Sequence, residues 1–333
     1  MRKTFASHFI SPSLLVISFF FLCYLAVWAI AFFYSESAIF PKRLSPAAVA
    51  IQSVFSQYKF LLILLSCSAS IFNAILLVVF SNRFILVNTR SILPVFIFLL
   101  LICVWSCLYT ALYSHLTLTL FIASLFSFFK MYHDRKAVEH AYMGSFLIAC
   151  ASIIIPEYVF LLLACWIVLF NFKSFSLRTF LASIIGVLTP FILYFSCFYL
   201  FDGSVDFSWF FNHFIIETTF SIGDFSGYFL TYVAIIFFIL VFCATSVYAD
   251  FSKNTIHARK NLNFILFILL FSIAIRVFYT DTLTSLMPLT VLGSTIFLSH
   301  AFTLKQTKFW RFLFVCFFLT NILFAFIGIF LSR

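Results

Sequence analysis

The sequence predicts an all-α, polytopic membrane protein, a single bundle of about 11 transmembrane helices. Three observations lead to this fold class. The 333 residues are 65% hydrophobic and only 9% charged, with a mean hydropathy of +1.18. Apolar runs of about 20 residues recur along the chain, and each is long enough to cross ~30 Å of hydrocarbon as a helix. The runs are continuous rather than alternating, which favours helices over the strands of a barrel.

The first two spans are expected near the basic start of the chain. The run at about 14–34 resembles a signal peptide but is longer than a usual signal core, so we expect an uncleaved first helix. Ser45 followed by Pro46 predicts an N-cap and the first turn of a helix over 46–80. This helix is ~50 Å long, more than one crossing needs, so we expect its first turns to lie along the membrane surface.

Nine further apolar runs complete the count, and two of them are short. The arms 141–155 and 157–172 are only ~22–24 Å long, so they form either a full hairpin or a re-entrant pair. Short spans mark binding sites in some transporters, although a local thickness mismatch also accounts for them. The nine runs are 92–111, 116–132, 141–155, 157–172, 179–201, 226–247, 262–279, 283–300 and 310–330.

Glycine and proline residues interrupt two of these spans. Gly186 and Pro190 predict a kink within 179–201, and Pro288 predicts another near the outer end of 283–300. Such kinks are tolerated in membranes because neighbouring groups satisfy the backbone atoms that proline frees.

The charges of the connectors indicate how the chain is threaded. With the N-terminus inside, the inner segments hold 15 of the 20 Lys and Arg residues, whereas seven of the ten Asp and Glu residues lie outside. An excess of cations marks the cytoplasmic side, so this alternation predicts an inside N-terminus and an outside C-terminus. The whole chain, 1–333, is then one transmembrane domain.

The longest polar interruption, 201–228, fixes the orientation of the later spans. It carries four acids and no Lys or Arg, as expected of a non-cytoplasmic segment. We expect an outer acidic loop at about 202–225, with a helix at about 208–220 lying along the membrane surface.

Several classes of site are not indicated by the sequence. The net charge of +10 comes from cations placed singly or in small groups between apolar runs, which is not the pattern of a nucleic-acid-binding face. All nine cysteines lie inside apolar runs; Cys103 and Cys107 are one helical turn apart, but buried thiols acting as small hydrophobes are the simpler interpretation. Nucleotide-binding and zinc-protease motifs are missing. We expect no metal, no cofactor and no nucleic-acid partner; protein partners are left open.

Two charges inside the apolar runs are the first candidates for function. Arg276 lies ~21 Å from the inner end of its span, about two turns below the outer surface. Its candidate partners are the outer carboxylates Glu157, Asp281 and Glu217, and Glu157, at the tip of the short pair, is the first choice. We expect the two side chains to face a shared, outward-opening cavity, where an anionic head group can replace the carboxylate. The simpler alternatives are that Arg276 snorkels to the interface and that Glu157 is an interfacial carboxylate in water.

Four further candidates come from the outer segments. His213 and Glu217 share one face of the expected surface helix, an arrangement that suits either a general base or a plain hydrogen bond. Lys42 and Arg43 are outer cations that suit a phosphate, although isolated exceptions to the charge rule are common.

About a third of the chain resembles an uncharacterised multi-pass family of bacterial envelope membrane proteins. The resemblance consists of an arginine before a span started by proline, a short helical pair, and then an arginine and a span containing glycine and proline. It implies a bacterial inner-membrane protein and supplies no catalytic residue. The matching segments are NRFILVNTRSILP at 82–94, GSFLIACASIIIPEYVFLLLACWIVLF at 144–170 and SLRTFLASIIGVLTPF at 176–191.

Three functions remain open at this point. The first is a multi-pass protein of the bacterial inner (cytoplasmic) membrane with an envelope-related, non-enzymatic role. The second is an outer-leaflet enzyme acting on a lipid-linked substrate, such as a glycosyl or head-group transferase or a polymerase. The third is a small-molecule or lipid transporter. The lipid bilayer is the expected partner in all three, with a lipid-linked or anionic substrate in the second.

Overall fold

The computed structural model describes residues 14–34, 45–87, 91–132, 134, 137–202, 227–250, 256–278, 285–304 and 307–331. Four candidate residues, Lys42, Arg43, His213 and Glu217, lie outside these ranges, as does the surface helix expected at 208–220. The described residues are almost entirely helical and contain no strand, which confirms the all-α prediction.

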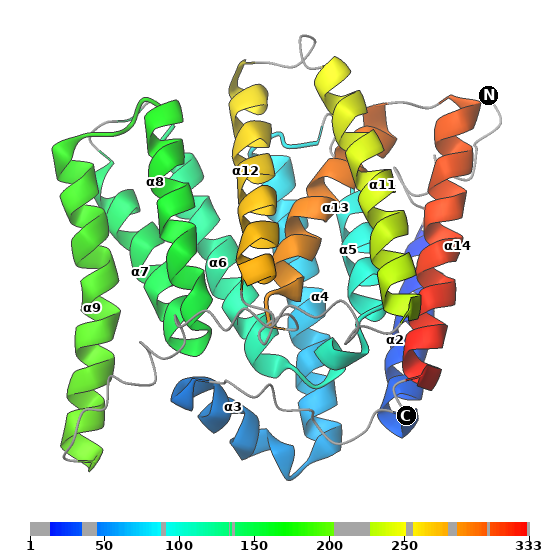
Figure 1. Ribbon diagram of the computed structural model, residues 1–333, viewed down its shortest axis with the longest axis horizontal. Helices are drawn as coiled ribbons and strands as arrows, with labels where there is room; N and C mark the ends of the chain where they lie inside the picture. Colours follow the sequence, from blue (N-terminus) through cyan, green and yellow to red (C-terminus); the bar gives the residue numbers. More distant parts are fainter. Residues whose placement is uncertain are drawn as a thin grey trace.

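Long helices run up and down the molecule, and short ones close its lower end (Figure 1). Seven helices, α4, α6, α9, α11, α12, α13 and α14, are long and apolar enough to cross a membrane. The elements are α2 (Leu14–Tyr34), α3 (Pro46–Ser56), α4 (Lys59–Arg83), α5 (Leu93–Cys103), η1 (Ser106–Tyr109), α6 (Leu112–Lys130), α7 (Val138–Ile154), η2 (Pro156–Phe160), α8 (Leu161–Asn171), α9 (Leu177–Asp202), α11 (Gly227–Ala249), α12 (Ile256–Phe278), α13 (Met287–Leu304) and α14 (Lys308–Leu331).

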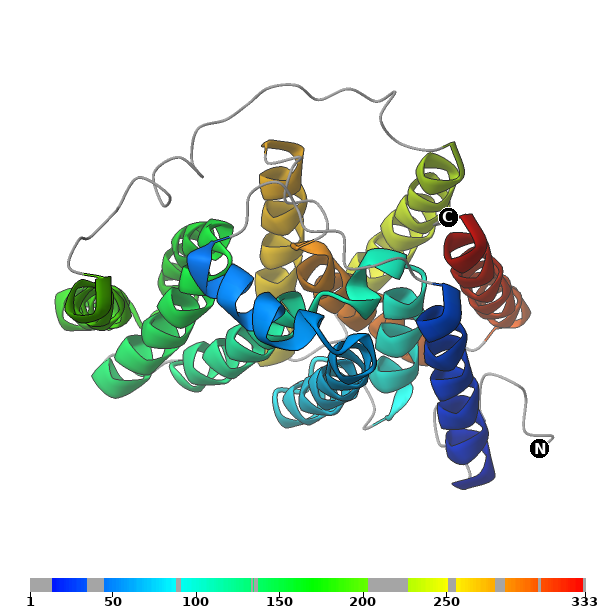
Figure 2. The same ribbon diagram turned by 90° about the horizontal axis from the view of Figure 1, so that it is seen from below.

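Helix α13 forms the centre of the bundle. Every residue of Met287–Thr303 is buried, and α5, α11 and α12 pack around this helix. Helix α9 lies at one edge of the molecule and α14 near the opposite edge (Figure 2). Both edge helices carry many exposed apolar side chains, so they offer the surface that hydrocarbon would cover.

Helices α7 and α9 pack closely against each other, and glycine permits the approach. A Cβ atom added to Gly186 would lie 2.4 Å from the carbonyl oxygen of Tyr142. Helix α9 continues through Pro190 without a break. The role of Gly186 is therefore close packing against α7, because small residues let helices in lipid approach each other.

The single helix expected over 46–80 is two helices. The chain turns at Tyr58, and α3 lies across the lower end of the bundle beneath α6 and α7 (Figures 1 and 2). Two side chains hold α3 there: Ser45 Oγ donates to Ile154 O at 2.6 Å, and Gln52 Nε2 donates to Thr110 O at 2.7 Å. These tertiary hydrogen bonds are satisfied only when α3 leaves the axis of α4. The expectation that these first turns lie along the membrane surface stays a prediction.

The span expected at 92–111 is also interrupted. Helix α5 ends after three turns, Trp105 is extended, and η1 follows before α6 begins at Leu112. The expected connector at Ser114 and His115 is therefore the first turn of α6, and both side chains are fully buried.

Two further proline residues lie where helices begin. Helix α13 begins at Met287, so Pro288 occupies its first turn, where a missing N–H costs no helical hydrogen bond, instead of kinking a span. Pro156 begins η2, which joins α7 to α8 at the lower end (Figure 1).

Positive charge gathers at one end of the described bundle. This is the upper end in Figure 1, where α4, α6 and α8 finish and α9, α12 and α14 begin. Of the ten Lys and Arg residues among the described ones, two belong to the lower end, Lys59 in the first turn of α4 and Arg276 in the last turns of α12. The other eight are Arg83, Lys130, Lys173, Arg178, Arg259, Lys260, Lys308 and Arg311.

Candidate functional site

The interruption between α5 and α6, residues 104–111, is the centre of the candidate site. An interrupted helix frees backbone carbonyls, and these need new partners wherever water is excluded. Tyr109 Oη donates to Cys103 O at 2.5 Å, and Gln52 Nε2 donates to Thr110 O at 2.7 Å. Two side chains thus replace helical hydrogen bonds, one from η1 and one from α3.

His115 and Asn73 hold the next turn. His115 Nε2 lies 3.2 Å from Leu108 O, which this nitrogen satisfies when it carries the ring proton. Asn73 Nδ2 of α4 donates to His115 O at 2.9 Å, and Asn73 Oδ1 accepts from Thr119 Oγ1 at 2.7 Å. His115 and Asn73 are fully buried, so α4 and α6 are joined through an internal polar network.

Arg276 lies beside this interruption. Its Nη1 donates to Thr290 Oγ1 at 3.1 Å, and that hydroxyl donates to Met287 O at 2.9 Å. The Cys107 thiol of η1 is an electrostatic neighbour of the guanidinium. The guanidinium therefore bonds to the first turn of α13 and lies close to η1, while Arg276 as a whole is half-buried.

Three helix ends meet at this point. Tyr113 Oη in the first turn of α6 lies 3.3 Å from Ser285 Oγ, two residues before α13. The C-terminus of α12 carries a negative partial charge that favours Arg276, whereas the N-termini of α6 and α13 carry positive partial charges. One guanidinium and two helix N-termini make this end of the bundle attractive to an anion.

Four buried polar atoms near the interruption have no hydrogen-bond partner in the described part of the chain. They are Gln52 Oε1, Ser114 Oγ, His115 Nδ1 and Arg276 Nε. Buried polar atoms are normally bonded to protein, water or a ligand, so these four provide unused donors and acceptors. Arg276 Nε matters most, because an unbonded donor on a charged group is the most costly of the four.

Comparisons with known protein families, with curated proteins and with solved structures find no match for this chain. The function must therefore be argued from the geometry of the site.

The structure gives different surroundings to the two charges that the sequence singled out. Arg276 is half-buried and bonded to Thr290, a hydroxyl partner that the sequence reasoning did not consider. Glu157 is only 1% exposed, so it is not a carboxylate on a wet tip. The neighbouring Tyr158 is fully buried against Phe121, and the start of α3 contacts the end of α7 beside this tip, where Ser45 donates to Ile154 O. The cavity shared by Arg276 and Glu157 stays a prediction, as do the roles of Lys42, Arg43, His213 and Glu217.

Sequence reasoning missed the polar residues that complete the site. Gln52 and Asn73 were treated as part of long apolar helices, and His115 as part of a connector. A signal was available: amide and imidazole side chains inside apolar runs are costly in lipid unless they bond to something. Within the described residues, no three His, Cys, Asp or Glu side chains gather to hold a metal ion.

Proposed function

We propose that this chain is a multi-pass protein of the bacterial inner membrane, with an envelope-related role, that binds an anionic group at Arg276. The proposal rests on the surroundings of the Arg276 guanidinium. The guanidinium lies in an apolar bundle and is bonded to the neutral hydroxyl of Thr290, and within the described residues, which leave out 279–284, its buried Nε has no hydrogen-bond partner. A charge in such surroundings requires compensation, and an anion entering from the lower end supplies it.

The threading that we propose has eleven crossings. Helices α2, α7, the broken unit of α5 with η1, and the unit of η2 with α8 would join the seven long helices. The eight described cations at one end support this scheme, because cations collect on the cytoplasmic side. The end that holds Arg276 would then face outward, as would the C-terminus.

Binding is favoured over catalysis by the residues around the guanidinium. Its described neighbours are the Thr290 hydroxyl and the Cys107 thiol, with no described carboxylate or imidazole bonded to it. An outer-leaflet enzyme acting on a lipid-linked substrate would require His213 or Glu217 to supply a base and Lys42 or Arg43 to hold a phosphate. A transporter would use the interrupted helix, since discontinuous helices form substrate sites in many transporters.

Phosphate binding by the purified full chain tests the proposal. We expect inorganic phosphate to raise the melting temperature in detergent micelles, because a ligand that binds the folded state stabilises it. Arg276→Gln should weaken the apparent affinity about ten-fold or more, which is the size of a lost charge-assisted hydrogen bond. Arg276→Lys should retain part of the response, since the charge remains but the planar donor pair is lost.

Lys59→Gln is the matched control, because Lys59 is a cation at the same end of the bundle but belongs to α4. An unchanged phosphate response in Arg276→Gln would refute the site. If Arg276→Gln and Lys59→Gln lower the apparent affinity for phosphate equally, phosphate is attracted to the positive charge of that end in general and is not bound at Arg276.

A further inference from the structure

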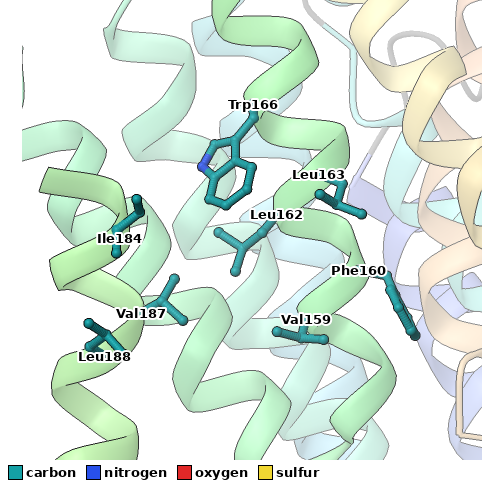
Figure 3. A pocket seen from close by; sticks show the side chains of 8 residues that line it. All are labelled: Val159, Phe160, Leu162, Leu163, Trp166, Ile184, Val187 and Leu188. Atoms are coloured by element: carbon teal, nitrogen blue, oxygen red, sulfur yellow. The ribbon is translucent and has the colours of Figure 1, made fainter. Parts of the chain in front are cut away.

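A second feature lies at the edge of the bundle, between α8 and α9. An apolar groove of about 300 Å³ separates the two helices (Figure 3). Leu162 and Trp166 of α8 and Val187 of α9 project into it (Figure 3). Its outer rim includes Leu163 and Leu188, so an occupant would meet only hydrocarbon side chains and the indole ring.

The groove exists because α8 and α9 are held by different neighbours. Helix α9 packs closely on α7, and α8 packs on α12. Between them the Trp166 side chain makes a bridge: its Nε1 donates to Ser183 Oγ at 2.9 Å, and its ring contacts Phe180 at 5.1 Å between centroids. This bridge fixes the upper wall and leaves the space below it unfilled.

The groove opens toward the expected lipid. Side chains on the outer side of α9 are exposed at helical spacing, among them Leu181, Ile185, Leu188 and Ile192. Helix α9 is one of the seven that can cross a membrane. An occupant of this groove must therefore be a chain that is stable in hydrocarbon, and a lipid acyl chain has the required shape and polarity.

Basic side chains lie at one end of the same helix pair. Lys173 follows α8, Arg178 lies in the first turn of α9, and both are exposed. Lys173 is fixed in a left-handed turn with φ 55°, which the Ser174 N to Leu169 O bond of 3.2 Å closes. From Arg178 the groove residues Ile184 to Leu188 are ~9 to 15 Å along the helix, a depth that an acyl chain reaches from its head group.

We propose that this groove binds one acyl chain of an anionic phospholipid, whose phosphate lies against Lys173 and Arg178. The positive N-terminal end of α9 adds to the attraction. Basic pockets between transmembrane helices hold anionic head groups in this way. The lipid belongs to the leaflet at the basic end, opposite to the end of Arg276, so the proposal does not rest on the anion site and fails independently of it.

Quenching of tryptophan fluorescence by brominated lipids tests the proposal on the full chain in vesicles. The contribution of Trp166 is the difference between the wild type and Trp166→Phe. Brominated phosphatidylglycerol should quench this fluorescence at lower mole fraction than brominated phosphatidylcholine. Each basic residue near a membrane surface strengthens binding of an anionic lipid about five-fold, so Lys173→Gln with Arg178→Gln should abolish the preference.

Three comparisons make the result decisive. Arg178→Lys should keep the preference, because the charge is conserved. Lys308→Gln with Arg311→Gln changes two cations at the same end on α14, at the other edge of the molecule, and should leave the preference unchanged. Val187→Phe places a ring in the groove and should reduce quenching of Trp166 by both lipids.

Equal quenching by the two lipids, or a preference that survives removal of both cations, would overturn the head-group site. If the preference for phosphatidylglycerol falls equally in the Lys308→Gln, Arg311→Gln control, the preference comes from general surface charge and not from a site at Lys173 and Arg178. Quenching that is unchanged by Val187→Phe would show that no acyl chain enters the groove.

Discussion

Substituting Gly186 by alanine tests whether the approach of α7 and α9 determines the stability of the bundle. A Cβ atom at this position would lie 2.4 Å from Tyr142 O, whereas ordinary contact begins at 3.4 Å. Since the obstacle is the backbone of α7, the helices must separate by the missing distance of about 1 Å. Overpacking a tight interior lowers the free energy of unfolding by about 1–3 kcal/mol. We expect a loss of about 3 kcal/mol here, because a backbone atom cannot turn aside as a side chain can. Alanine recovers about 1 kcal/mol of helix propensity, so the net loss should be about 2 kcal/mol.

Two other glycines give a graded comparison. At Gly144 the added Cβ atom would meet the ring of Phe128 at 2.8 Å, and a side chain can turn aside, so the loss should be smaller. At Gly227, the first residue of α11, it would meet nothing within 4 Å, so alanine should be neutral within ~0.5 kcal/mol. The free energy of unfolding of the full chain in bicelles, measured by steric trapping, gives the three values. A Gly186→Ala variant as stable as the wild type, or no less stable than Gly227→Ala, would refute the reasoning.

Three further predictions follow from local features. Ile85, just after α4, has φ 52°, a costly conformation for a β-branched residue. Ile85→Gly should therefore raise the free energy of unfolding by about 1 kcal/mol. Ile75→Gly, within α4, should lower it by about as much in the same unfolding assay. Gln52→Leu leaves Thr110 O without its donor and should lower the free energy of unfolding by about 1–3 kcal/mol. Alanine at the exposed neighbour Ser53 should change it by less than ~0.5 kcal/mol. Equal effects of the two substitutions would show that the Gln52 hydrogen bond does not hold α3 in place. Reporter fusions after Lys173 and after Asp206 should report opposite compartments, and equal signals would exclude the threading.

The helices themselves were predictable because lipid imposes a simple rule. A span needs enough apolar residues, and the expensive cations remain at its ends. Helix α4 is only the later part of the helix expected over 46–80, whereas each of the other six helices long enough to cross coincides with one expected span, as α11 does with 226–247 and α14 with 310–330. Their ends differ from expectation by a few residues, as at Met287 of α13, because local capping rather than hydropathy decides where a helix begins.

The interruption of the 92–111 span was not predictable from its own residues. Helix α5 is uniformly apolar, and no glycine or proline lies between Cys103 and Ala111. The partners that make the interruption possible come from Gln52, which is distant in sequence, and from Tyr109 and His115, whose orientation only the fold defines. Arg276 was identified because its charge is visible in sequence, but its bond to Thr290 depends on how α12 and α13 pack.

The interrupted helix also explains why Gln52, Asn73 and His115 can be buried near the start of α6. In a bundle of continuous helices the backbone bonds are satisfied internally, and polar side chains add only cost. Once α5 ends at Cys103, the free carbonyls of Leu108 and Thr110 in the interruption make buried Gln and His side chains favourable at this end. Each such side chain has more donors and acceptors than one carbonyl requires, which leaves Gln52 Oε1 and His115 Nδ1 unused. A guanidinium placed beside these atoms, and beside two helix N-termini, meets a polar region within the apolar bundle. The anion site that we propose at Arg276 depends on this interruption, so restoring a continuous α5 should remove the polar network and the proposed site together.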